Sequence, residues 1–381
     1  MKLPIDLKAV IEAATDIESA RSTPVSVSVL IDDSAPGDVA AHVRSAFVGA
    51  GAHARVTVGY FAGPAFSPYE GDDMAVIVAG FSEEVGRRAA KIRAAGVPAM
   101  VVTSMPRLVA DMASAYGNPI PEGDLVAPEG VEGCEADGDA ACASGEVACA
   151  HMSVFTGIRA KGSAGSAAGS AGSSDDPDAP ILIDDAAAAA LDRRMGEWVV
   201  AACREKRLAL ALSFPFVRRP LSLEAVSATS LQNAGIGLVL FIPGADMPLM
   251  TLNQAKMLLR IAAAYGEPMS AARVKELAAI VAGGFACRSL ARQVAGVVPG
   301  VGWAVKAGVG YAGTKAMGLA AIEYFERGGN IAGLAGVVSS ATAKATQIAG
   351  DVAATPAGAR VLSTVKTAVR QGAASVLKKT E

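Results

Sequence analysis

The turn after the first predicted strand is where a nucleotide would bind in a parallel α/β protein. Its residues, "DDSAPGDV" from Asp32 to Val39, match the phosphate-binding pattern G-x-x-x-x-G-K-[ST] only at Gly37. That pattern needs a lysine to neutralise phosphate and a hydroxyl to hold magnesium, whereas Asp38 and Val39 stand at those places. Because carboxylates at 32, 33 and 38 would repel phosphate, the sequence predicts a degenerate phosphate loop with no cofactor.

A base-reading motif is the second chemistry that such a chain could carry. A GTPase has Asn-Lys-x-Asp after the strand that corresponds to "VPAMVV", and this chain has "TSMP", from Thr103 to Pro106. None of these four side chains has the amide or carboxylate that reads guanine. The sequence therefore gives no motif for nucleotide hydrolysis.

The sequence also shows no recognisable cluster of residues for metal binding or for nucleophilic catalysis. The three histidines are expected in different surroundings, within a helix, before a strand and beside a loop: His42, His53 and His151. The five cysteines form no CxxC pair, and reduced thiols are expected. The spacings of the first three are wider than those of zinc sites. The cysteines are Cys134, Cys142, Cys149, Cys203 and Cys287. We therefore predict no catalytic, metal or cofactor-binding residues, and a protein that is not an enzyme.

The elements around these residues follow an α/β rhythm in the first third of the chain. Short runs rich in valine and isoleucine occur at 25–31, 54–61, 73–81 and 97–104, and helical stretches at 38–51 and 82–96 separate some of them. This alternation predicts βαβ units and a parallel sheet. Residues 1–117 are thus expected to form an α/β domain, either a degenerate P-loop-GTPase-like or a Rossmann-like one.

Regular patterning stops after this domain. Residues 118–180 are acidic and rich in Gly, Ser and Ala, which predicts a flexible linker or surface insertion. "ILIDD", at 181–185, fits either a returning strand of the first domain or the start of the next one. From residue 186 the pattern becomes helical, so 181–330 are expected to form an all-α domain of helical hairpins, and Pro215 and Pro220 are expected to break the chain.

Charge divides the chain into two unlike halves. Residues 1–185 hold 12 Lys and Arg against 26 Asp and Glu, a net charge of −14, and residues 186–381 hold 22 against 11, a net charge of +11. Mean hydropathy is +0.38, with 52% apolar residues but only 5% aromatic ones, which predicts helices packed through small side chains. The asymmetry fits two halves that attract each other, or a C-terminal half that faces something anionic.

The first helical hairpin is predicted around a rigid elbow. An uncharged run ends at Pro243, Gly244, Asp246 and Pro248, and a new apolar helix is expected to begin directly afterwards. Thr251 and Gln254 have the spacing of a T-x-x-Q capping box at its start. The elbow would turn one buried helix back against another, with Asp246 fixing the turn.

A second hairpin is predicted about a Pro-Gly turn. Its turn comprises Pro299, Gly300, Gly302 and Trp303. In the helix that follows, small residues recur every four positions and predict a close contact with another helix. They are Ala304, Gly308, Ala312, Ala316 and Ala320. Lys306 and Lys315 lie near opposite sides of this helix. Each would cost about 2.5–3.5 kcal/mol at the middle of a bilayer, so an interfacial, re-entrant or soluble hairpin is favoured over two full spans.

The two hairpins carry a resemblance to a known family. "IPGADMPLMTLNQAKMLLRIAAAYGE" and "GFACRSLARQVAGVVPGVGWAVKAGVGYAGTKAMGLAAIEYFERGG", within residues 208–330, resemble the bacterial family called domain of unknown function 697, which is related to YcjF-like proteins. The resemblance implies a helical, GTPase-associated module with members assigned to the inner membrane. It implies no established activity, and GTP hydrolysis does not carry over because the phosphate loop is degenerate.

The last predictions concern where the protein lies in the cell and what it binds. The basic, alanine-rich tail 331–381 fits an amphipathic helix or a solvated segment, without the aromatic interleaving of nucleic-acid binders, and the first residues lack a signal peptide. We predict a membrane-associated adaptor or scaffold at the cytoplasmic side of the inner membrane that binds anionic lipid, and a GTPase or a second copy as a further partner. The alternatives are a soluble cytoplasmic bundle whose basic face binds the acidic half, and a soluble nucleotide-binding or GTPase-associated regulatory protein with an unrecognised site.

Overall fold

The structure is a computed structural model of the whole chain. It describes residues 13–62 without 16, 20 and 52, together with 71–128, 180–239, 246–268, 302–329, 334 and 336. Within helices, the side chains of 237–239, 246, 247 and 302–310 are not described. All statements below concern the described residues.

Five parallel strands form one sheet, as the sequence predicts. They are β1 (Val25–Ile31), β2 (Ala54–Tyr60), β3 (Met74–Val78), β4 (Ala99–Val102) and β5 (Leu125–Val126). Their order is β2-β1-β3-β4-β5, and every neighbouring pair is parallel. The predicted run 25–31 coincides with β1, and the next three predicted runs each contain a strand.

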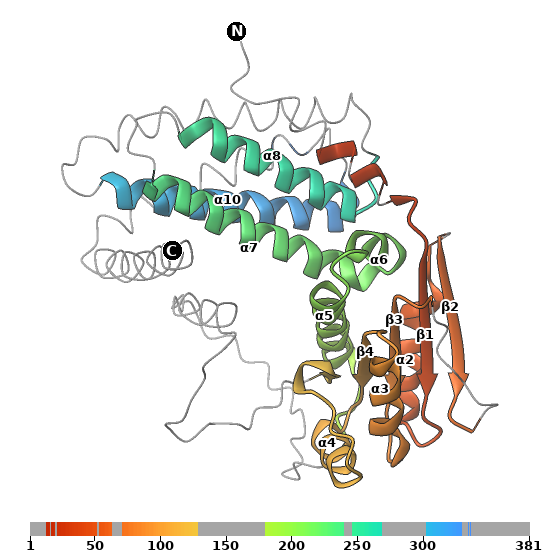
Figure 1. Cartoon of the computed structure of the whole chain (residues 1–381). Helices are drawn as coiled ribbons and strands as arrows, with labels where there is room; N and C mark the ends of the chain where they lie inside the picture. Colours follow the sequence, from red (N-terminus) through yellow and green to blue (C-terminus); the bar gives the residue numbers. More distant parts are fainter. Residues whose placement is uncertain are drawn as a thin grey trace, which may run out of the picture.

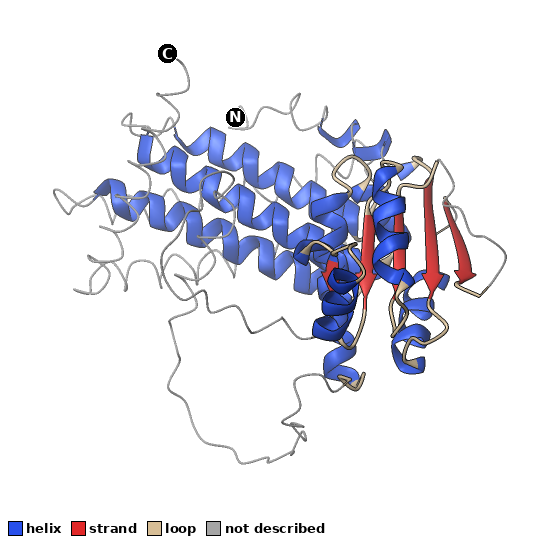
Figure 2. Cartoon of the chain, turned by 60° about the horizontal axis from the view of Figure 1, so that its bottom comes forward, coloured by secondary structure: helices blue, strands red, loops and turns tan. Residues whose placement is uncertain are grey.

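Helices cover both faces of this sheet, whose strands Figure 2 shows side by side. One face packs against α2 (Gly37–Val48) and α5 (Asp185–Ala202), and the other packs against α3 (Glu84–Ala94) and α4 (Pro106–Ala115). Successive residues of β3 alternate between the two apolar clusters, because successive side chains of a strand point to opposite faces. The central strands β1, β3 and β4 are therefore buried on both sides, as is usual for parallel strands, whereas the edge strand β2 is partly exposed.

The α/β part extends beyond residue 117, where the sequence analysis ended it. A single turn of 3-10 helix, η1 (Glu122–Asp124), leads into β5, and β5 pairs with β4. Helix α5 belongs to the segment expected to be the all-α domain, yet it packs against the sheet through Leu191, Met195 and Val199. "ILIDD" forms no strand, and Asp184 caps α5 by accepting a hydrogen bond from the backbone N–H of Ala187 (2.8 Å).

The helical part is a bundle that follows α5 in the chain and packs against it. It comprises α6 (Arg207–Ser213), α7 (Pro215–Val239), α8 (Asp246–Ala264) and α10 (Gly302–Glu326). Figure 1 shows α7, α8 and α10 side by side, with α5 and α6 between them and the sheet. One continuous apolar cluster runs from the strands through α5 and α6 to Val217 and Leu221 of α7, so the two parts share a core.

Two predicted helix boundaries are wrong. Pro220 does not break the chain, because it lies inside the continuous helix α7, which Pro215 begins. Thr251 does not cap a helix, because α8 already begins at Asp246 and includes Pro248 in its first turn, where a missing N–H costs no helical bond. Thr251 and Gln254 are instead buried inside the bundle, since positions three apart share one helix face.

The buried face of α8 takes part in a polar layer that joins three helices. Gln254 Nε2 and Asn233 Nδ2 both donate to Thr314 Oγ1, over 2.8 and 2.9 Å. Asn253 Nδ2 donates to Asn233 Oδ1 over 3.1 Å. Because buried amides lose free energy unless they are paired, this layer favours one register of α7, α8 and α10.

Helices α7 and α10 approach each other closely at Gly318. A Cβ atom added to Gly318 would come within 2.3 Å of the side chain of Val226, so the glycine is needed for this contact. The predicted contact lies on a stripe two positions away, whose described members Ala312, Ala316 and Ala320 are half-buried. Gly308 lies in α10, but its surroundings are outside the described side chains.

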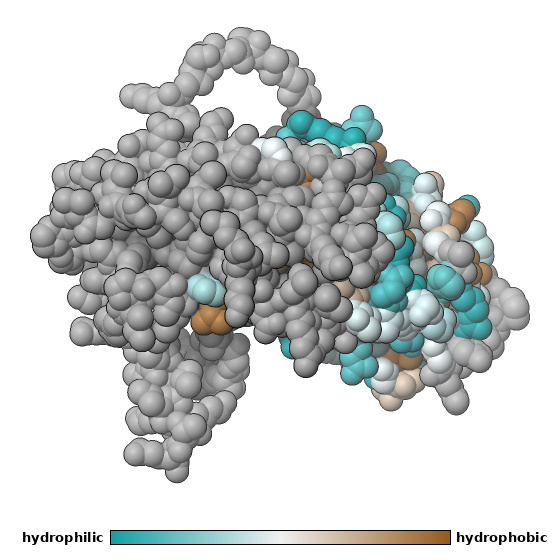
Figure 3. All heavy atoms as spheres, turned by 90° about the horizontal axis from the view of Figure 1, so that it is seen from above, coloured by the Kyte–Doolittle hydropathy of each residue, from teal (hydrophilic) through white to brown (hydrophobic). Residues whose placement is uncertain are grey.

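The described surface has no large apolar area in view. Seen from above, its side nearest the sheet is largely hydrophilic, with apolar residues scattered singly (Figure 3), which is ordinary for a protein surface. None of the helices that the structure describes has the length and apolar character needed to cross a bilayer.

Candidate functional site

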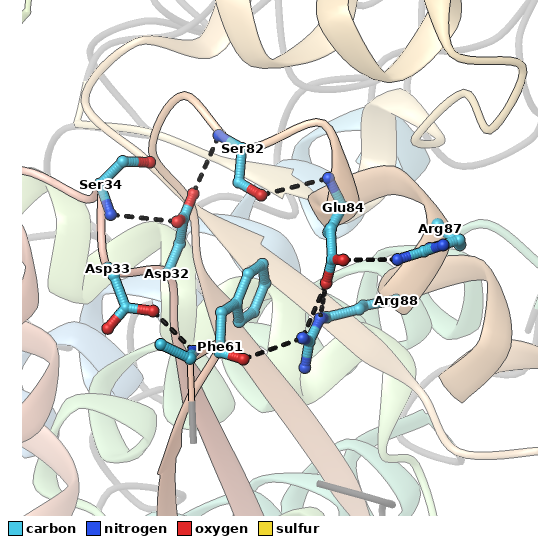
Figure 4. A network of polar contacts seen from close by, with 9 residues as sticks. Asp32, Asp33, Ser34, Phe61, Ser82, Glu84, Arg87 and Arg88 are labelled. Carbon is cyan, nitrogen blue, oxygen red and sulfur yellow. Dashed lines mark hydrogen bonds and ion pairs between the residues drawn. The ribbon is translucent and has the colours of Figure 1, made fainter. Parts of the chain in front are cut away.

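The candidate site lies at the carboxyl ends of β1 and β3. The strand order reverses here, because the chain passes from β1 to β2 on one side and then to β3 on the other. In open α/β sheets, ligands bind in the crevice beside such a switch point. Figure 4 shows that polar side chains from the loops after both strands meet there.

Asp32 is the centre of this network. It follows β1 and is only 3% exposed, and its carboxylate accepts three backbone hydrogen bonds. The donors are the N–H groups of Ser34 (3.1 Å), Gly80 (2.9 Å) and Ser82 (3.2 Å). Converging backbone N–H groups of this kind bind anions, so the carboxylate of Asp32 fills the place that a ligand anion would take.

The two loops touch each other directly. Ser34 Oγ accepts a hydrogen bond from the N–H of Phe81, after β3, over 2.8 Å. On the other side, Asp33 Oδ2 accepts one from the N–H of Ala62, after β2, over 2.7 Å. A Cβ atom on Gly80 would come within 2.3 Å of the Ser34 backbone. Only glycine permits this approach, so the loop after β1 is closed onto the loop after β3 by the chain itself.

A charged cluster flanks the closed loops. Ser82 Oγ accepts from the N–H of Glu84 over 3.2 Å, and α3 begins at Glu84, two residues after the predicted start of this helical stretch. Arg88 donates to Glu84 over 2.8 Å and lowers the pKa of this carboxyl, with a further contribution from Arg87. Arg88 also donates to the carbonyl of Phe61 and lies 4.1 Å from its ring centre. These arginines are engaged within the protein.

The positions that correspond to the phosphate-loop lysine and hydroxyl carry no phosphate-binding groups. Asp38 accepts hydrogen bonds from the N–H of Val39 (2.9 Å) and of Ile183 (3.2 Å). The side chain of Val39 is fully buried in the core beneath the sheet. A magnesium ion therefore has no hydroxyl ligand at this position.

The segment that stands where a GTPase has its base-reading motif is also turned inward. Thr103 and Ser104 are both buried, and Thr103 Oγ1 accepts from the N–H of Met105 over 3.1 Å. Pro106 begins α4. Ser104 Oγ has no hydrogen-bond partner, while the Ser104 carbonyl accepts from the N–H of Ile181 over 3.0 Å. Residues 181–183 thus connect the end of β4 to the start of α2.

Histidine and cysteine residues lie away from this edge. His42 Nε2 is 2.8 Å from Asp192 Oδ1 and links α2 to α5, and His53 lies before β2. Cys203 is a buried free thiol whose pKa is raised to about 12 by burial and by the charge of Asp73. In the described part of the chain, no group of three His, Cys, Asp or Glu side chains is placed to hold a metal ion.

Several predicted site residues fall outside what the structure describes. Pro243, Gly244, Pro299 and Gly300 lie outside the described residues, as do His151 and the remaining four cysteines. Asp246, Gly302 and Trp303 lie in helices, but their side chains are not described. The role of Asp32 as an acceptor for three amides was missed, because the sequence analysis treated it only as a charge that repels phosphate.

The fold and the site together define an α/β protein with a helical bundle, in which the crevice at the switch point is occupied by the chain. Comparisons with protein-family models, curated proteins and solved structures find no match to this chain. The resemblance of residues 208–330 to domain of unknown function 697 stays a prediction.

Proposed function

We propose that the protein is a non-enzymatic adaptor or scaffold whose α/β part is a degenerate relative of the P-loop GTPase domains. The observation that carries this proposal is the position of Asp32, whose carboxylate occupies the converging amides of Ser34, Gly80 and Ser82. A phosphate at the same place would have to displace a buried negative charge. Buried Val39 supports the same conclusion, because it replaces the hydroxyl that holds magnesium.

Nucleotide binding tests this proposal. We expect GTP, GDP and ATP, each with magnesium, to give no saturable heat in calorimetry and no shift in the midpoint of thermal unfolding. A ligand with micromolar affinity, supplied at a thousand times its Kd, would stabilise the protein by about 4 kcal/mol, so the measurement is sensitive. Micromolar binding that disappears when residues 32–39 are changed would overturn the proposal and favour the nucleotide-binding alternative.

The proposal places the adaptor at the cytoplasmic face of the inner membrane, with anionic lipid as a partner of the helical part. Its support is the net charge of +11 on residues 186–381. Among the described residues, the two parts meet mainly through an apolar core, with charged bridges such as Lys206 with Asp73 at 2.7 Å. Each well-placed Lys or Arg adds roughly 1 kcal/mol at an anionic surface.

Cell fractionation with successive washes tests this location. We expect the protein in the membrane fraction, and release by high salt would show that electrostatic attraction holds it there. Retention through alkaline carbonate would show inserted hairpins. Complete recovery in the soluble fraction without detergent would reject the membrane proposal in favour of the soluble bundle.

A further inference from the structure

A second candidate site lies in the helical part, where α7 begins and where α8 and α10 end. It is a cleft of about 220 Å³ lined by Pro215, Arg218 and Arg219 of α7, Tyr265 after α8, and Phe325 and Glu326 of α10. Pockets for drug-sized molecules usually span roughly 300–1,000 Å³. A cleft of this size suits a ligand group of few heavy atoms.

The charges in the cleft do not cancel. Arg219 pairs with Glu326 at 2.5 Å, and this hydrogen bond raises the pKa of Arg219. The other oxygen of Glu326 accepts from the Tyr265 hydroxyl over 3.2 Å, so this carboxylate is fully engaged. Arg218 donates through Nε to the carbonyl of Ala211 over 3.2 Å and pairs with no described carboxylate. One guanidinium charge in the cleft is therefore uncompensated.

The position of the two arginines adds to this imbalance. Arg218 and Arg219 lie close to the N-terminus of α7, and no acidic residue is present in its first turn. Cations are disfavoured near a helix N-terminus because the helix dipole is positive there. A bound anion would offset both the dipole and the guanidinium of Arg218.

The floor of the cleft is aromatic. The rings of Tyr265 and Phe325 stack with centroids 5.9 Å apart and planes 17° apart. Burial raises the pKa of Tyr265, and Glu326 raises it further, so the phenol stays neutral and its hydroxyl donates a hydrogen bond to Glu326. The cleft is thus lined by charged side chains together with the aromatic side chains of Tyr265 and Phe325, which favour an apolar or aromatic body.

We propose that this cleft binds one oxyanion group, a carboxylate or a phosphate monoester, carried on a small aromatic or apolar body. Arg218 supplies the recognition, because Nε is anchored on Ala211 and its two terminal amino groups remain for a two-pronged contact with the oxyanion. The aromatic body lies over Tyr265 and Phe325. This inference does not depend on the proposed function of the α/β part.

Ligand-observed NMR on the full chain tests the site with benzoate, phenyl phosphate, inorganic phosphate and neutral benzamide. We expect saturable binding of benzoate and phenyl phosphate and none of benzamide. Arg218→Gln should weaken binding by about tenfold, the scale of one charge-assisted hydrogen bond. Arg218→Lys should restore part of it by returning the charge without the fork.

Arg204→Gln is the matched control, because Arg204 is an exposed arginine in the turn after α5 and does not line the cleft. It should leave binding unchanged, and thermal unfolding should confirm that all variants are folded. Equal affinities for the Arg218→Gln variant and the parent would overturn the proposal, as would the absence of saturable binding. Inorganic phosphate that binds as tightly as phenyl phosphate would overturn the role of the aromatic floor.

Discussion

Replacing Asp32 with alanine is expected to lower the free energy of unfolding by about 3 kcal/mol or more. The variant would leave the N–H groups of Ser34, Gly80 and Ser82 without their acceptor at a buried edge. Each buried donor left unpaired costs roughly 1–3 kcal/mol, and water entering the space recovers part of this. Urea unfolding followed by the fluorescence of buried Trp198 measures the change.

Asp33→Ala is the control in the same loop. Asp33 accepts one hydrogen bond, from the exposed N–H of Ala62, so its loss should cost less than about 1 kcal/mol. Formate provides a second check, since it has the shape of the missing carboxylate. It should stabilise the Asp32→Ala variant more than chloride does at equal ionic strength, and equal costs at positions 32 and 33 would contradict the assigned role of Asp32.

The second large effect is expected at Gly196, in the middle of α5. A Cβ atom at this position would lie 2.5 Å from the carbonyl oxygen of Phe216 and 2.7 Å from Cγ of Pro220. Pro220 has no N–H, so that carbonyl has lost its helical donor, and the glycine lets α5 approach it. Gly196→Ala should therefore lower stability by about 2 kcal/mol through overpacking against a backbone atom that cannot move freely.

A glycine with open surroundings gives the matched control for this variant. A Cβ atom at Gly235, in α7, would meet nothing within 4 Å. Gly235→Ala should raise stability by about 0.5–1 kcal/mol, because alanine costs less entropy than glycine in a helix. Opposite signs for these two Gly→Ala changes in urea unfolding are the expected result, and stabilisation by both would reject the close contact between α5 and α7.

Pro220→Ala adds a test of the mechanism. It removes Cγ and returns a donor to the Phe216 carbonyl, so the cost of Gly196→Ala should shrink in this background. We expect a coupling free energy of at least about 0.5 kcal/mol between the two changes. Simple additivity would show that Pro220 does not contribute to the contact.

The strands β1 to β4 could be predicted because each lies in a local run rich in valine and isoleucine. The alternating valines of "VSVSVLI" end at a pair of aspartates, and β1 spans the same residues. The role of Asp32 was not predictable in this way, because its three donors include Gly80 and Ser82, which lie far along the chain. A carboxylate placed directly after one buried strand, with a glycine placed two residues after another, is the signal that would have indicated it.

The errors in the helical part have a common origin. T-x-x-Q has the spacing of a capping box and equally the spacing of two residues on one helix face, and only the partner Thr314 on α10 distinguishes the two. Pro220 was read as a break because a helix interior normally excludes proline. The cleft at Arg218 was missed, since it needs the ends of three helices that are remote in sequence.

The attachment of α5 to the sheet has a consequence for synthesis on the ribosome. The strands are complete at Val126, but the helix that covers one of their faces begins only at Asp185. At roughly 5–20 residues per second, translation needs about 3–12 seconds to pass from the end of β5 to the start of α5. During that interval the side chain of Val126 on β5, the strand that contacts α5, has no helix over it, and we expect a ribosome-associated chaperone to bind the nascent sheet at this apolar edge.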